Sequence, residues 1–400
     1  MTPEIKQRIE QMCRGEVPEG YKKGKLGIVP KEWNETSFST LFTSTSDYTD
    51  DLEKYPLYSL TIEDGITPKT ERYERSYLVK KEDSYKIVRP NDYAYNPMNL
   101  RFGAVARHKG DMPVAVSGYY DIFTTVHESD LPFMDSFLTC GPMITYYNRV
   151  STGSLVEKQR VHFSQFLEFV LPLPSINERA KIAAILTTQG KVIELKEKRL
   201  AEKQRQKKYL MYRFFVDAKG KKIRLGQIAN VTMGQSPPSI SYNEHMEGMP
   251  LIQGNGDIEG RNTQPRMYTT QPTKICKKED ILISVRAPVG SVSRSSMNAC
   301  IGRGMCAIDA GIYQDYVYQY LIYFEDKWGK VSQGSTFESI SGDEIRKLKI
   351  LIPDNMQHIA KILSTADHEI DLLQQDIEQE KQKKKALMQL LLMGIVRVNA

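Results

Sequence analysis

The side chains of this sequence that could do chemistry are mostly cations and amides, set in polar segments between apolar runs. Arginine, lysine, asparagine and glutamine form the hydrogen bonds that read base edges in DNA, and the cations also neutralise phosphates. Segments between apolar strands are loops, which project such side chains from the surface. Each candidate could also be an ordinary solvated loop residue. The candidate DNA-binding residues are Arg101, Arg107, Lys109, Gln253, Asn255, Arg261, Arg286, Arg294 and Arg303, with His108 and Arg266 beside them.

The sequence contains no recognisable catalytic motif. A methyltransferase that extrudes its target base needs a pocket, commonly Asn/Asp-Pro-Pro-Tyr/Phe. The nearest segments, Asn96-Pro97-Met98 and Ser236-Pro237-Pro238-Ser239, both depart from that pattern. The glycines between Gly254 and Gly260 lack the Gly-x-Gly-x-x-Gly spacing, and the six histidines form no metal-binding pair. We therefore expect no catalytic residue, no metal and no cofactor in this chain.

Composition limits the class of protein. An apolar fraction of 40% and a charged fraction of 26% are typical of a globular chain, and the net charge of +6 permits a polyanionic partner. Apolar runs stay well short of the ~20 residues of a membrane span, and the first thirteen residues lack the apolar centre of a signal peptide. Five cysteines at irregular spacings fit neither a disulfide framework nor a zinc site. We expect reduced thiols in a cytoplasmic protein.

The elements that would position the candidate residues are organised by a helix written twice. Residues from about 179 to 215 repeat, without a gap, as residues from about 356 to 392. Ile182 then matches Ile359, and Ile193 matches Ile370 at the same offset. About 35 residues of helix form a rod of roughly 50 Å. A repeat of this length predicts the architecture before any local element is assigned.

Apolar residues at alternating steps of three and four follow each predicted helix, a spacing typical of a coiled coil. Since each stripe is narrow and partly polar, the obvious partner of one helix is the other. The predicted interface residues are Leu186, Ile193, Leu200, Leu210, Leu363, Ile370, Leu373, Ile377 and Leu387. The polar residues that interrupt the stripes are Gln189, Lys196, Lys203, Lys207, Glu380 and Lys384.

Each long helix follows a region of short apolar runs rich in Tyr, Val, Ile and Thr, which predicts strands. The two regions match loosely, since Asp92-Tyr93-Ala94-Tyr95 aligns with Asp280-Ile281-Leu282-Ile283. The predicted fold class is α+β, with two strand-rich recognition domains and two long helices in an antiparallel coiled coil with internal pseudo-twofold symmetry. The predicted segments are an N-terminal helix and link (1–25), a first domain (26–174), a first helix (175–216), a second domain (217–353), and a second helix with its tail (354–400).

This arrangement resembles the specificity subunit of type I restriction-modification systems. The segment Gly27-Ile28-Val29-Pro30-Lys31-Glu32-Trp33 is similar to the Gly-x-Ile-Pro-x-x-Trp motif that opens the first recognition domain in that family. The segment from Asp280 to Gly290 and the closing segments, Gly153 to Pro174 and Gly334 to Pro353, resemble the family as well. The first domain departs most, because residues 95–103 stand where the second domain has residues 284–290.

The resemblance implies a DNA-recognition subunit that is not an enzyme. Each domain would read one half-site of double-stranded DNA, and the helices would set the unread gap, about one turn of B-DNA. Two copies of a methylation subunit would dock and carry S-adenosylmethionine, with restriction subunits as further partners. Two alternatives stay open at this point: a self-contained methyltransferase or endonuclease, and a coiled-coil scaffold that binds no DNA.

Overall fold

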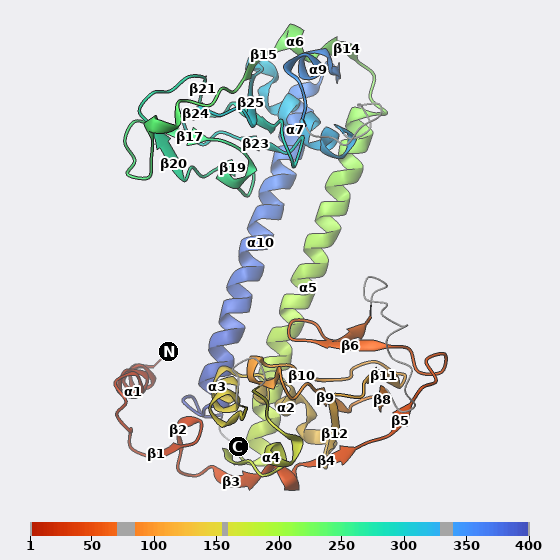
Figure 1. Cartoon of the computed structure of the whole chain (residues 1–400), viewed down its shortest axis with the longest axis vertical. Helices are drawn as coiled ribbons and strands as arrows, with labels where there is room; N and C mark the ends of the chain where they lie inside the picture. The colour runs from red at the N-terminus through yellow and green to blue at the C-terminus, as the bar shows by residue number, and fades with distance from the viewer. Residues whose placement is uncertain (1, 70–84, 154–158, 329–338, 399–400) are drawn as a thin grey trace. The chain divides into compact units, whose positions relative to one another are not determined.

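A computed structural model describes residues 2–69, 85–153, 159–328 and 339–398, so Gly334 in the second closing segment lies outside the described residues. The chain folds as two units (Figure 1). Unit 1 comprises residues 1–195 and 377–400, and unit 2 comprises residues 196–376. Each unit therefore contains one strand-rich domain and a part of each long helix.

In unit 1 the described strands of the first domain form sheets with the orders β10-β9-β12-β4, β11-β8-β5, β13-β3 and β6-β7, and β1 pairs with β2 before the domain. The strands are β1 (Tyr21–Gly24), β2 (Gly27–Pro30), β3 (Asn34–Ser37), β4 (Phe42–Thr45), β5 (Tyr48–Thr49), β6 (Tyr58–Thr61), β7 (Gly65–Pro68), β8 (Tyr85–Val88), β9 (Tyr93–Tyr95), β10 (Val105–Arg107), β11 (Val114–Ser117), β12 (Asp121–Thr125) and β13 (Val170–Leu173). The helices are α1 (Pro3–Cys13), α2 (Leu131–Phe137), α3 (Gly141–Val150) and α4 (Phe163–Leu167).

In unit 2 the described strands of the second domain form sheets with the orders β15-β25-β22-β23-β19-β18, β16-β20-β17-β24-β21 and β14-β26. The strands are β14 (Lys221–Arg224), β15 (Asn230–Met233), β16 (Tyr242–Asn243), β17 (Met249–Ile252), β18 (Ile258–Glu259), β19 (Asn262–Thr263), β20 (Met267–Thr269), β21 (Ile275–Cys276), β22 (Ile281–Ser284), β23 (Val292–Arg294), β24 (Ala299–Ile301), β25 (Met305–Asp309) and β26 (Lys349–Ile352). The helices are α6 (Leu225–Ile228), α7 (Gln314–Phe324) and α9 (Gly342–Lys347).

Each domain has a central sheet, and the two sheets have the same strand order. Taking β4, β9, β10 and β12 as the counterparts of β15, β22, β23 and β25, the order β10-β9-β12-β4 becomes β23-β22-β25-β15, which is the order found in the second domain. The turn before the central strand also recurs, because Asp92 accepts a hydrogen bond from Arg89 N (3.0 Å) and Asp280 accepts one from Lys277 N (2.8 Å). The loose sequence match between the domains therefore reflects a duplicated topology.

Both central strands are buried on two faces by alternating side chains. Tyr93 and Tyr95 point into an aromatic core, where the rings of Tyr93 and Phe123 stack with centroids 5.2 Å apart, while Ala94 joins a separate cluster on the opposite face. In the second domain Ile281 and Ile283 enter one core and Leu282 enters another. The period of two expected for a strand places successive side chains on opposite faces.

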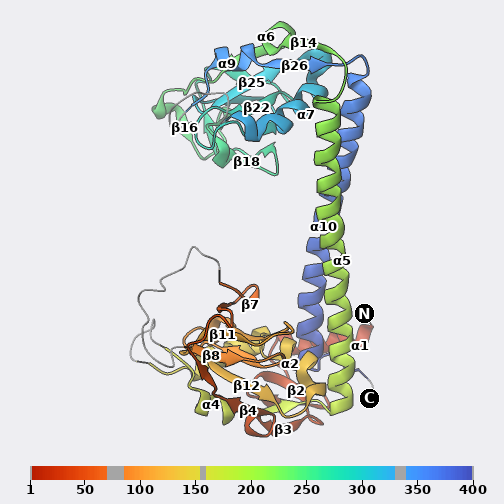
Figure 2. The ribbon, with the colours of Figure 1, turned by 90° about the vertical axis from the view of Figure 1, so that its right-hand side faces the viewer.

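The long helices are α5 (Ile176–Phe215) and α10 (Met356–Leu392), which run alongside each other (Figures 1 and 2). The predicted interface residues are buried or half-buried. Leu195 and Leu372, which stand off the predicted stripes, are 65% and 51% exposed. Fully burying one leucine or isoleucine side chain of the interface contributes roughly 1.5–3 kcal/mol. The apolar stripes therefore account for most of the attraction between the helices.

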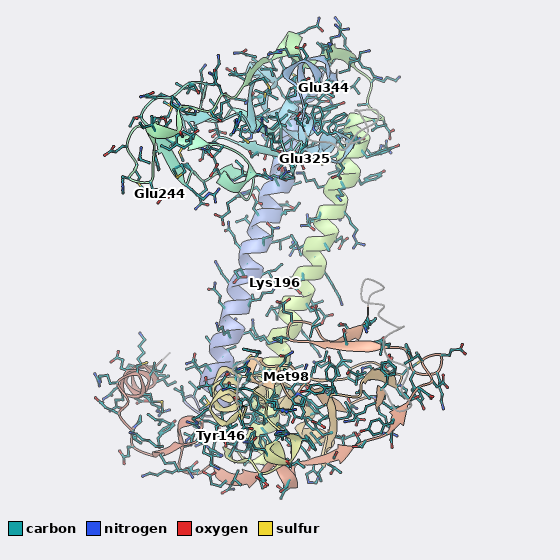
Figure 3. All side chains as sticks on the ribbon, viewed as in Figure 1. Met98, Tyr146, Lys196, Glu244, Glu325 and Glu344 are labelled. Carbon is teal, nitrogen blue, oxygen red and sulfur yellow. The ribbon has the colours of Figure 1, made fainter. Side chains whose placement is uncertain are left out.

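The polar residues that interrupt the stripe of α5 pair with α10. In unit 1 Gln189 Nε2 donates to Glu380 Oε2 at 2.6 Å. In unit 2 the distances are 2.8 Å from Lys196 Nζ to Asp376 Oδ1 and 2.7 Å from Lys203 Nζ to Glu369 Oε2, and Lys207 pairs with Asp367 (Figure 3 labels Lys196). Partner numbers fall as the α5 numbers rise, so the helices are antiparallel. Ion pairs at such positions mainly fix register and orientation.

Candidate nucleic-acid interface

A cavity of about 630 Å³ in the second domain gathers four of the predicted residues, Gln253, Asn255, Arg286 and Arg303. Its remaining lining is Ser236, Pro237, Ser239, Tyr242, Gly254, Ser284, Ala287 and Gly304. Among the residues that the structure describes, this lining contains no carboxylate. Cations, amides and hydroxyls without a neighbouring acid are the groups that bind phosphates and base edges.

Arg303 stands on the tight turn between β24 and β25, and glycines precede and follow it. A Cβ on Gly304 would lie 2.3 Å from Gln253 O, and one on Gly302 would lie 3.2 Å from Gln253 Cα. The Arg303 amide donates to Ser236 Oγ at 3.3 Å. Glycine is needed on both sides because the turn packs directly on the backbone at the end of β17. The turn thereby presents Arg303, an exposed side chain, to the cavity.

The loop that carries Arg286 is held by Ser284, the last residue of β22. Ser284 Oγ donates to Pro288 O at 2.5 Å and accepts a hydrogen bond from Ser291 N at 3.0 Å. Gly290 is buried against Trp328, and a Cβ at this position would lie 2.3 Å from the indole ring. These contacts fix both ends of the loop and leave Arg286 exposed at the cavity wall.

Asp257 organises the segment that carries Gln253 and Asn255. Its buried carboxylate accepts hydrogen bonds from Gln253 N (2.8 Å) and from Arg266 Nε (3.1 Å). Arg266 therefore helps to hold this loop through Asp257, although its side chain remains 70% exposed. Gln253 is itself exposed and Asn255 half-exposed, so both amides can reach a ligand.

Arg261 and Arg294 are placed in ion pairs away from this cavity. Arg261 makes a bidentate contact with Glu325, at 2.6 and 2.8 Å, which raises the pKa of the guanidinium (Figure 3 labels Glu325). Arg294 donates to Asp315 Oδ1 at 2.6 Å and lies over the ring of Tyr318. Both guanidinium groups thus have a structural role, and their contact with DNA stays a prediction.

The first domain places Arg107 and Lys109 in a pocket of about 420 Å³ that also contains acids, namely Glu63, Asp64 and Asp135. Arg107 Nε and Nη2 donate to the two oxygens of Asp135 at 3.0 and 2.8 Å, and Lys109 Nζ lies 3.4 Å from Oδ2. The hydrogen bond with Asp135 raises the pKa of Arg107. A ligand that enters this pocket would therefore contact acidic side chains as well as these two cations.

Arg101 and His108 do not join Arg107 and Lys109 as free side chains. Arg101 Nη1 donates to Gln159 Oε1 at 3.0 Å, and its guanidinium lies over the ring of Phe102. His108 is buried, with Nε2 2.7 Å from Met112 O. Of its candidate residues, the first domain thus brings Arg107, His108 and Lys109 to one pocket, and Arg101 lies outside the lining of that pocket.

Eight lining residues of the second-domain cavity lie outside the predicted set, and three of them, Ser236, Ser239 and Tyr242, supply hydroxyl groups from residues 236–242. In the sequence, the segment containing the two serines stands out only as an incomplete match to a methyltransferase motif. Small polar residues around two prolines give no local sign of binding, because their role depends on Arg303, which lies more than 60 positions away in the sequence. Their hydroxyls add donors and acceptors to the cationic wall.

The cysteine thiols give no sign of reactivity. Cys13 is exposed, whereas Cys140, Cys276, Cys300 and Cys306 are buried, and none forms a disulfide within the described residues. Burial raises the pKa of Cys140 to about 11 and that of Cys306 to about 12, so both remain thiols at neutral pH. Over the same described ranges, no cluster of three metal-ligating side chains and no helix able to span a membrane is found.

Comparisons with known proteins agree with this picture. Residues 219–382 match the family model of the type I restriction modification DNA specificity domain. The chain is 28% identical, over 95% of its length and 97% of the relative, to the MjaX specificity subunit assigned to a type I restriction enzyme of Methanocaldococcus jannaschii.

Two solved structures share the fold. One, from work on the assembly and conformational transition of a type I restriction-modification system, is 20% identical with a TM-score of 0.62, over 92% of this chain and 99% of that chain. The other, the S subunit of a type I restriction-modification system from M. genitalium, is 14% identical with a TM-score of 0.58, over 90% and 96% of the two chains. Both likenesses extend across the two domains and the long helices.

Proposed function

We propose that this chain, a member of the family of type I restriction-modification specificity subunits, uses the cavity of its second domain to read one half of a bipartite DNA target. It is a DNA-recognition subunit without a catalytic centre of its own. The alternatives of a self-contained methyltransferase and of a scaffold without DNA are not favoured, because the family match covers the domain that contains the cavity.

The observation that carries the assignment of the surface is the lining of the second-domain cavity. Arg286 and Arg303 supply positive charge, and Gln253 and Asn255 supply amides that can both donate and accept hydrogen bonds. DNA presents phosphates along its backbone and donor–acceptor patterns at its base edges, and this set of side chains matches both. A carboxylate in the same place would repel the duplex.

The duplicated architecture supports the proposal of two catalytic partners. Two domain-helix units with one topology would offer equivalent docking surfaces to two methylation subunits related by pseudo-twofold symmetry. We expect S-adenosylmethionine to be bound by those subunits, and restriction subunits to join the same complex. We also propose a cytoplasmic location, shared with the chromosome that such a complex would act on.

Selection from a random duplex library tests the function. The full chain, co-purified with its methylation subunits, should enrich sequences with two fixed half-sites and an unread gap between them. Binding should also weaken steeply as salt is raised, because cations that contact phosphates release counterions from DNA. Failure to enrich any sequence, together with a flat salt response, would exclude DNA recognition.

Calorimetry on the chain alone tests the absence of a cofactor site. S-adenosylmethionine added to the purified chain should give no binding heat, and the complex with methylation subunits should give a saturable signal. Stoichiometric binding by the chain alone would contradict the assignment of the cofactor to the partner.

A further inference from the structure

We propose that Arg303 reads a guanine in the half-site bound by the second domain, through paired hydrogen bonds from its guanidinium to the O6 and N7 atoms of that base. The inference rests on the proposed function, because it requires a duplex in the second-domain cavity. In the major groove guanine presents two adjacent acceptors, and the planar fork of arginine matches their spacing.

The backbone that carries Arg303 is rigidly docked. Gly302 N donates to Ile252 O at 2.8 Å, and Gly304 O accepts a hydrogen bond from Val285 N at 2.9 Å. Gly302 and Gly304 are both buried, whereas Arg303 between them is exposed. A side chain that recognises a single nucleotide base benefits from a rigid backbone, because less conformational freedom is lost on binding.

The guanidinium of Arg303 is also available. Within residues 2–69, 85–153, 159–328 and 339–398, no carboxylate forms an ion pair with the Arg303 guanidinium. Among these residues, the one hydrogen bond between Arg303 and a side chain is made by the Arg303 backbone amide, to Ser236 Oγ. Arg261 and Arg294, in the same domain, have their donors committed to Glu325 and Asp315. An arginine without an acid partner keeps its full set of donors for a ligand.

Arg286 shares the cavity and the charge but differs in its setting. Arg286 follows the buried Val285 and forms an isolated β-bridge with Ser339, but the two residues after it, Ala287 and Pro288, are exposed. Its backbone is therefore packed on one side only, whereas that of Arg303 lies between two buried glycines. We assign Arg286 to a phosphate, a contact that tolerates a broader range of positions than a base edge does. Arg286 is therefore the charge-matched control for Arg303.

The experiment compares three variants of the full chain in complex with its methylation subunits: Arg303→Ala, Arg303→Lys and Arg286→Ala. Each complex selects from a random duplex library, and its affinity is then measured on the selected duplex and on duplexes substituted at single positions. For Arg303→Ala we expect one G·C position of a single half-site to lose its preference, with roughly 5- to 150-fold less discrimination there. Arg303→Lys should keep non-specific affinity while losing most of that discrimination, because lysine lacks the fork.

Arg286→Ala should instead weaken binding to all duplexes alike and reduce the salt slope by about one. The assignment fails if Arg303→Ala acts uniformly on all sequences, if Arg286→Ala is the variant that relaxes the G·C position, or if the half-site affected by both contains no fixed G·C pair. In each of these outcomes the complex still selects a bipartite target, so the proposed function survives. A wild-type complex that selects nothing would defeat the proposed function itself. Circular dichroism of each variant confirms that it is folded.

Discussion

The cations of the first-domain pocket and those of the second-domain cavity stand in opposite electrostatic settings. In the first domain Arg107 and Lys109 share the carboxylate of Asp135, in a pocket that also contains Glu63 and Asp64. The second-domain cavity, taken over its described lining, combines two arginines with amides and hydroxyls. The partners of a cation, more than its residue type, therefore determine whether it can bind a ligand. Arg107 is committed to the fold, and Arg303 is not.

The network around Asp135 shows how strong that commitment is. Burial alone would raise the pKa of Asp135, but the hydrogen bond from Arg107 and the charge of Lys109 bring it below its usual value. Tyr93, which donates to Asp135 at 2.8 Å, has a raised pKa, mainly because it is buried and then because of that carboxylate. The four side chains form one cluster that fastens β9 and β10 to α2.

The largest expected difference between the two settings is in stability. Arg107→Ala should cost about 1–3 kcal/mol, because it leaves the half-buried Asp135 without its bidentate partner. Arg286→Ala, at an exposed side chain, should change stability by no more than about 0.5 kcal/mol. Hydrogen exchange of the β9 and β10 amides measures the first change locally, and exchange of β22 measures the second. Equal effects of the two substitutions would remove the distinction.

Acid should weaken the first domain through Asp135. Its folded-state pKa lies below the unfolded value of about 3.9, so the stabilisation is fully present above that pH and is lost as pH falls through the folded pKa. Asp135→Asn should flatten this part of the pH dependence, at the cost of lower stability near neutrality. Exchange of the β9 amides at pH values between about 2 and 7 gives the comparison. An unchanged pH profile in the Asn variant would contradict the role of the carboxylate.

An acid placed in the second-domain cavity should make it resemble the first-domain pocket. Ser239 is exposed, so Ser239→Glu should leave the fold intact while placing a carboxylate against the duplex. We expect at least roughly tenfold weaker DNA binding by the complex, since like charges across an interface are costly. Ser239→Gln has nearly the same shape without the charge and is the control. Equal affinities of the Glu and Gln variants would show that DNA does not approach this wall.

The reverse change in the first domain should have the smallest effect. Glu63 is exposed in the pocket with Lys109, and Glu63→Gln removes one negative charge. Non-specific DNA affinity should rise about two- to threefold at low salt, and the gain should disappear at high salt because exposed charges are screened. Glu10→Gln on α1 removes the same charge elsewhere and should give a smaller gain. A gain that persists at high salt would point to a direct contact instead.

The long helices could be predicted because their signals are local and periodic. Steps of three and four identified Leu186, Leu363 and Ile377, which are 2%, 0% and 5% exposed. The same pattern marked Lys196 and Lys203 only as interruptions. Their partners, Asp376 and Glu369, lie 180 and 166 positions away, and these pairs could not be predicted before the register of the two helices was known.

The candidate site could be predicted by residue type but not by setting. Arg261, Arg294 and Arg303 look alike in the sequence, because each stands in a polar segment beside a strand. Only the folded chain brings Glu325 to Arg261 and Asp315 to Arg294, while Arg303 has no acid partner among the residues that the structure describes. The serines of the cavity were missed for the same reason. Glycines on both sides of Arg303 were the one local sign of its constrained position.

The central claim is that the second-domain cavity reads one half of the target. Its most direct test is library selection by the full complex carrying the double substitution Arg286→Ala and Arg303→Ala, compared with the unsubstituted complex. The account predicts weaker binding overall, with one half-site selected as before while the other loses its preference at one G·C position. Retention of both half-sites with unchanged preference would contradict it, and so would loss of both half-sites by a complex that is shown to be folded and assembled.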